Sequence, residues 1–122
     1  MKITKIFFHL INLIFIIFYL YPGSILGFIL YSNFSKQPQV TPDFYFSSNH
    51  VYAFMALTFL GLISHVNKKH ILIYFTFISI FLELSHLIIP NRSFQFGDLF
   101  GNILGVFISI LIIKIYNYLE KK

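Results

Sequence analysis

The chain has 122 residues, of which 57% are hydrophobic and only 11% are charged. Soluble globular domains carry about 25% charged residues, so this composition excludes a soluble enzyme with an ordinary polar surface. The chain contains no cysteine, which excludes disulfides, thiol nucleophiles and thiolate zinc sites. Because its length is that of one domain, we expect a single lipid-solvated domain covering residues 1–122.

The first apolar segment, residues 3–21, predicts a membrane span. A helix of this length measures about 28 Å, which matches a hydrocarbon core of about 30 Å. Pro22 and Gly23 end the segment and no Ala-x-Ala-like cleavage site follows, so we expect an uncleaved anchor. The next apolar run, residues 25–31, is too short to span the bilayer and is expected to lie at its interface.

Three further apolar segments are long enough to cross a membrane, and they cover residues 50–66, 71–89 and 98–118. Only residues 67–69 separate the first two of these segments, which predicts antiparallel neighbours packed side by side. The predicted fold class is therefore all-α, an integral membrane bundle of four transmembrane helices.

The distribution of lysine and arginine predicts the orientation of this bundle. With the N-terminus in the cytoplasm, seven cations lie on the cytoplasmic side, and only Lys36 and Arg92 lie on the other. This excess favours an arrangement with both termini inside. The cytoplasmic cations are expected to contact membrane lipids, and no nucleic-acid partner is expected because a soluble basic face is lacking.

Most of the polar exceptions to the apolar pattern lie between residues 83 and 105. Glu83 and His86 are three residues apart and so share one face of the third span. Pro90 lies seven positions after Glu83, which places the carboxylate about 10 Å below the outer end of a continuous helix. A carboxylate at that depth requires a partner.

The last predicted span returns from the same side and begins with a second polar pair, Asp98 and Asn102. We expect both pairs to meet around Arg92 in the connecting turn, because its planar guanidinium suits carboxylates and phosphates. His50 starts the second span on this side and is a further candidate. The candidate ligand-binding residues are Glu83, His86, Arg92, Asp98, Asn102 and His50.

Three interpretations of this cluster remain open. In the first, Arg92 pairs with Asp98 or Glu83 and holds two helices together. In the second, some of its donors face an anionic headgroup or pyrophosphate in the outer leaflet. In the third, Glu83 and His86 transfer protons or bind a metal in a catalytic centre. We predict no metal and no cofactor, because Glu-x-x-His plus one Asp is a sparse ligand set that recurs by chance.

A stripe of small residues at four-residue spacing runs along the last span, and it consists of Gly97, Gly101, Gly105 and Ser109. Repeated glycine costs helix stability, so such a stripe indicates that another backbone packs closely against it. The partner is either another segment of this chain, a second copy in a homo-oligomer, or a different membrane protein.

The same residues resemble a known family. The pattern E-x-x-[H/Q] followed by NRSFxFxDLxGNxLG is similar to the signature region of VanZ-like membrane proteins. The residues that match it are Glu83, Arg92, Asp98, Asn102 and Gly105. Upstream, LYPGS at residues 20–24 is similar to the Leu-Pro-Gly that closes the family's first span.

Residues 49–62 occupy the place of the family's Asp-Lys-x-x-His-Phe segment, and here the sequence departs from the pattern. Asn49 and His50 replace the acidic-basic pair, Ala53 stands at the position of the histidine, and His86 takes the position of a glutamine. A role that the family gives to its histidine would need His50 or His86 in this chain.

The family is named for a protein linked to resistance to the glycopeptide teicoplanin, and its members resemble small bacterial membrane proteins without an established molecular activity. The resemblance implies a multi-pass protein of the bacterial cytoplasmic (inner) membrane with a role in the cell envelope. The leading hypothesis is binding of an anionic lipid or lipid-linked cell-wall precursor through Arg92. The alternatives are an assembly subunit that docks through the small-residue stripe, and a small intramembrane hydrolase or transferase acting on a lipid phosphate.

Overall fold

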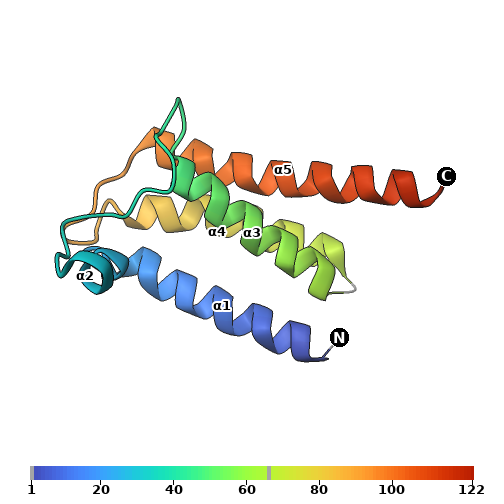
Figure 1. Ribbon diagram of the computed structural model, residues 1–122, viewed down its shortest axis with the longest axis horizontal. Helices are drawn as coiled ribbons and strands as arrows, with labels where there is room; N and C mark the ends of the chain where they lie inside the picture. The colour runs from blue at the N-terminus through green and yellow to red at the C-terminus, as the bar shows by residue number, and fades with distance from the viewer. Residues whose placement is uncertain (1, 66) are drawn as a thin grey trace.

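The computed structural model describes residues 2–65 and 67–122, and within these ranges the chain forms helices and no strands. In chain order the helices are α1 (Lys2–Leu20), α2 (Ile25–Tyr31), α3 (Ser48–Ser64), α4 (Lys68–Ser85) and α5 (Phe96–Glu120). The four long helices alternate in direction, so both termini lie at the end of the bundle where α3 turns into α4 (Figure 1). The all-α fold class is confirmed for these ranges.

Two of the helices, α1 and α5, are long and apolar enough to cross a membrane, each with a mean hydropathy of 2.1. Helix α3 is apolar but has only 17 residues. Helix α4 has 18 residues and includes three charged ones, Lys68, Lys69 and Glu83. Membrane character therefore rests on α1 and α5, and four crossings remain a prediction.

Helices α3 and α5 each begin two residues earlier than predicted, and the limits of α4 differ most from the predicted ones. Helix α3 begins at Ser48 rather than residue 50, and its predicted last residue, Val66, lies outside the described residues. Helix α4 ends at Ser85 rather than residue 89. The amides of the next three residues bond to carbonyls three positions back, and Pro90 disfavours helical geometry before it. Glu83 consequently lies in the last turn of α4 and not about 10 Å inside a longer helix.

The segment after α1 forms a single short helix, α2, that packs against the loop following it. The Ser24 hydroxyl caps α2 by accepting a hydrogen bond from the Gly27 amide at 2.9 Å. A Cβ atom on Gly27 would lie only 1.7 Å from the Lys36 carbonyl oxygen, so only glycine permits this approach. Helix α2 and its loop thereby lie beside the C-terminal end of α1 (Figure 1).

The interior of the bundle contains apolar side chains from all four long helices, including Phe8, Phe54, Phe75 and Val106. Much of the outer surface is apolar as well. On α1 alone, more than half of the surface of Leu10, Leu13 and Ile17 is exposed. An apolar exterior of this kind suits contact with lipid chains and not with water.

The small-residue stripe of α5 packs against α3 of the same chain. A Cβ atom on Gly105 would lie 2.5 Å from the Val51 carbonyl oxygen, and the Ser109 hydroxyl donates to the Met55 carbonyl at 2.7 Å. A Cβ atom on Gly101 would lie 2.9 Å from the Ser47 carbonyl oxygen. Gly97 has looser surroundings, because its nearest such contact is at 3.7 Å. This packing brings the first turns of α3 and α5 together, which sets the position of the polar site.

Candidate functional site

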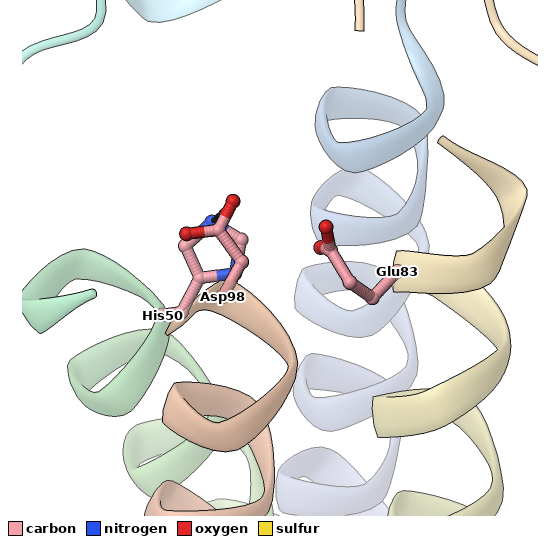
Figure 2. A group of neighbouring side chains, drawn as sticks. All are labelled: His50, Glu83 and Asp98. Atoms are coloured by element: carbon pink, nitrogen blue, oxygen red, sulfur yellow. Dashed lines mark ion pairs between the residues drawn. The ribbon is translucent and has the colours of Figure 1, made fainter. Parts of the chain in front are cut away.

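The six candidate residues lie at the end of the bundle opposite the termini. They are His50 in the first turn of α3, Glu83 in the last turn of α4, His86 at its C-cap, Arg92 in the connection to α5, Asp98 in the first turn of α5, and Asn102 one turn further. Figure 2 shows His50 and Asp98 side by side, with Glu83 opposite them on α4. The structure thus brings five of the six side chains into one connected polar cluster and places Arg92 beside it.

The centre of the cluster is a residue that the sequence did not single out, Tyr19 at the end of α1. Its buried hydroxyl donates to Glu83 Oε2 at 2.5 Å and accepts from Asn102 Nδ2 at 2.9 Å. His50 Nδ1 lies 3.1 Å away from the same oxygen. In the sequence Tyr19 is one of eight tyrosines and stands within an apolar run, so no pattern distinguished it.

Hydrogen bonds determine which ring nitrogen of His50 carries hydrogen. Asn102 is fully buried, and its Nδ2 donates to the Ser79 carbonyl at 3.0 Å, which fixes the orientation of the amide. Its Oδ1 can therefore only accept, and His50 Nδ1, at 2.8 Å, must be the donor. The other nitrogen, Nε2, faces Asp98 Oδ2 at 3.7 Å.

Glu83 is completely buried and is held by groups from three directions. Its Oε1 accepts from the Gln95 amide at 3.1 Å, its Oε2 accepts from Tyr19, and His86 Nδ1 lies 3.5 Å from Oε2. The opposite nitrogen of His86 donates to the Tyr19 carbonyl at 2.9 Å, and its ring stacks on the Tyr19 ring. A buried carboxylate needs such partners, because burying an unpaired charge is costly.

Arg92 does not form the expected ion pair with Glu83 or Asp98. Its Nε donates to the Tyr21 carbonyl at 2.9 Å, and its Nη2 donates to the Phe18 carbonyl at 3.0 Å. The last carbonyls of a helix lack partners within it, and Pro22 prevents α1 from continuing, so these oxygens attract donors. The first interpretation of the cluster, in which Arg92 pairs with Asp98 or Glu83, is therefore wrong about the partners of Arg92.

The charge of Arg92 persists in this position. Partial burial lowers the pKa of Arg92 from its ordinary value, while nearby negative charge, including that of Glu83 and Asp98, opposes this shift. An arginine side chain stays protonated under such conditions. Two neutral carbonyls hold the guanidinium without neutralising it, so a positive charge remains at this end of the bundle.

A cavity of about 850 Å³ opens over the cluster and is bounded by the loop that connects α2 and α3. The candidate residues His50, His86, Arg92 and Asp98 all line it. A second cavity of about 440 Å³ is lined by Pro22 and Gly23 and shares Arg92 with the first. Arg92 therefore borders both spaces, and a volume of this size accommodates a small molecule or a lipid headgroup.

These features define a helical protein with an apolar bundle and, at one end of it, a polar site whose residues line a cavity. The chain belongs to the VanZ/LLP1 family, whose sequence model matches residues 6–117. Family membership and the two apolar helices indicate a membrane protein. No curated protein and no solved structure matches the chain.

Proposed function

We propose that this chain is a multi-pass protein of the bacterial cytoplasmic membrane that binds an anionic lipid or a lipid-linked cell-wall precursor. The ligand's phosphate binds in the large cavity beside Arg92, with His50, His86 and Asp98 lining the same cavity and Asn102 holding His50 from behind. The observation that carries the proposal is Arg92, a guanidinium that lines both cavities and is held by main-chain carbonyls instead of a carboxylate.

The charges near the site support an anionic ligand. Two of the carboxylates have an imidazole neighbour, because Glu83 lies 3.5 Å from His86 and Asp98 lies 3.7 Å from His50. Arg92 keeps donors beyond the two that it uses, since a guanidinium has five N–H groups. Those donors match the oxygens of a phosphate group.

The arrangement of the bundle supports a site in the outer leaflet. The termini lie at the end of the bundle opposite α2 and the connection between α4 and α5 (Figure 1), and residues of that connection and of α2 line the cavity. Most of the lysines lie near the termini and where α3 turns into α4. If α1, α3, α4 and α5 all cross the membrane with the termini in the cytoplasm, the cavity faces outward.

The proposal is tested by lipid binding to the purified protein with Arg92→Gln. Glutamine keeps an N–H donor for the α1 carbonyls but removes the charge. We expect affinity for phosphatidylglycerol to fall by about tenfold or more, the value of a charge-assisted hydrogen bond, while binding of phosphatidylcholine is unchanged. Native mass spectrometry in detergent measures both.

Lys36→Gln is the matched control for this experiment. Lys36 is an exposed cation of the connecting loop that packs over the Tyr31 ring and lines neither cavity. It should leave phosphatidylglycerol affinity unchanged. If the two variants lose affinity equally, general charge attraction explains the binding. If neither loses it, Arg92 is not the anion site.

The alternatives receive different support. An assembly subunit that docks through the small-residue stripe is disfavoured, because Gly101, Gly105 and Ser109 already contact α3. A hydrolase or transferase acting on a lipid phosphate would use the same cavity, with His50 and Asp98 beside the substrate. Release of phosphate or headgroup by the purified protein would favour the enzyme over the binding protein.

A further inference from the structure

Three side chains from three different helices point their ligand atoms toward one space. They are His50 of α3, Glu83 of α4 and Asp98 of α5 (Figure 2). One nitrogen or oxygen from each lies within 4.8 Å of those of the other two. Ligands of one transition-metal ion lie about 3–4 Å apart, because each bond is about 2.0–2.2 Å long. Small side-chain rotations would bring all three atoms to these distances.

The hydrogen bonds around His50 prepare it as a metal ligand. Its Nδ1 donates to Asn102 Oδ1 at 2.8 Å, so in the neutral ring Nε2 carries the lone pair. That nitrogen faces Asp98 and has no hydrogen-bond partner among residues 2–65 and 67–122. Metal-binding histidines show this arrangement, in which the second ring nitrogen donates to an oxygen that fixes the ring.

Glu83 is likewise held in place by hydrogen bonds that leave lone pairs on its carboxylate. Its two oxygens each accept one hydrogen bond, from the Gln95 amide and from the Tyr19 hydroxyl. A carboxylate oxygen has two lone pairs, so both oxygens keep one for a cation. Glu83 is fully buried and Asp98 is partly exposed, so their negative charges repel each other at this site, and a divalent cation between them would offset that repulsion.

We propose that His50 Nε2 and the carboxylates of Glu83 and Asp98 bind one divalent first-row transition metal ion, of the Zn²⁺ type. One imidazole and two carboxylates are ligands that zinc accepts, and three protein ligands leave a position open. His50 and Asp98 line the large cavity, so a ligand in the cavity could reach an ion that they hold. His86 is left out of the ligand set because, among the described residues, only His50, Glu83 and Asp98 have ligand atoms that all lie within 4.8 Å of one another.

This site replaces the sequence-based expectation of no metal. The sequence suggested only Glu83, His86 and Asp98, a sparse set within one short segment. The structure exchanges His86 for His50, which comes from a distant helix and is oriented by Asn102. The metal site does not depend on lipid binding by Arg92, and each proposal can fail alone.

Metal binding to the full chain in detergent, without anionic lipid, tests the site. After treatment with a chelator, the protein is titrated with Co²⁺, whose visible absorption reports coordination, and then with competing Zn²⁺. We expect one ion per chain at this site. Asp98→Asn and His50→Gln should each weaken binding at least tenfold, and Asn102→Ala, which frees the ring of His50, should weaken it about 10- to 100-fold.

Two controls separate this site from incidental binding. Asp43→Asn changes a carboxylate that lines the same cavity but bonds the Ser48 amide instead, and it should bind metal normally. His65→Gln changes a histidine near His9, outside the cluster, and should also bind normally. Asp98 and His50 are each 20% exposed, so their variants are expected to fold even if Glu83→Gln does not. Wild-type affinity equal to that of Asp98→Asn would overturn the proposal.

Discussion

The hydroxyl of Tyr19 joins all four long helices at the polar end of the bundle. It belongs to α1 and contacts Glu83 of α4, Asn102 of α5 and His50 of α3. A buried group cannot replace a lost hydrogen bond with one to water. Glu83 and Asn102 are both fully buried. The Tyr19 hydroxyl is therefore a partner that Glu83 and Asn102 share and cannot replace with water.

Removing this oxygen should destabilise the protein. Tyr19→Phe leaves Glu83 Oε2 without its hydroxyl donor and removes one of the two acceptors of Asn102 Nδ2, and unsatisfied buried groups cost about 1–3 kcal/mol. We expect a lower midpoint of thermal unfolding in detergent. Tyr45→Phe, at a side chain that is 79% exposed, should leave the midpoint unchanged. Equal midpoints for wild type and Tyr19→Phe would contradict the role of the hydroxyl.

Some of the site residues were predictable because polar groups are costly within apolar helices. Glu83, Asp98 and Asn102 stood out for that reason, and His50 was placed on their side by the antiparallel order of the spans. The partners of Arg92 were not predictable, because they are main-chain carbonyls, one in the last turn of α1 and one just after it. Every residue has a main-chain carbonyl, so residue types do not show which carbonyl accepts a hydrogen bond. The sequence therefore suggested only a carboxylate as the partner of Arg92.

At the scale of elements, the contact between α3 and α5 positions the site. Gly101 and Gly105 let the two backbones approach, and the Ser109 hydroxyl donates across the contact to α3. The stripe could be predicted as a packing face from its spacing. Its partner could not, because a second copy of the chain would have produced the same pattern.

Gly105→Ala should separate α3 from α5. The added Cβ would meet Val51 O at 2.5 Å and Met55 N at 2.8 Å, and both are backbone atoms that cannot rotate away. Such overpacking typically costs about 1–3 kcal/mol. We expect a lower unfolding midpoint, together with weaker lipid and metal binding because His50 moves away from Asp98.

Gly97→Ala is the matched control on the same stripe. Its Cβ would meet only Tyr45 O at 3.7 Å, an ordinary contact, and alanine favours helix by up to about 1 kcal/mol. Its midpoint should stay the same or rise. A similar loss in both variants would show that the α3–α5 contact does not depend on the close approach at Gly105.

Helix limits were predicted well where proline or glycine interrupts the helix and less well elsewhere. Pro22 and Gly23 end α1 close to the predicted place, and Ser24 starts α2. Helix α4 was predicted too long, because residues after Ser85 are as apolar as those before it. The turn there depends on local hydrogen bonds and on His86 reaching α1, which hydropathy does not report.

At the scale of the whole molecule, the alternating helices predict where each connection lies relative to the membrane. The natural chain has no cysteine, so single cysteines report their own positions. In intact cells, Ser35→Cys and Ser93→Cys should react with a membrane-impermeant maleimide. Lys69→Cys and Lys122→Cys should react only after the membrane is permeabilised. Labelling of all four in intact cells would contradict four crossings.

An experimental structure of the protein in nanodiscs that contain phosphatidylglycerol would locate the anion itself. We predict a lipid phosphate in the cavity of about 850 Å³, in contact with the guanidinium of Arg92. An anionic headgroup bound elsewhere on the bundle, with Arg92 contacting only the Phe18 and Tyr21 carbonyls, would contradict the proposed function.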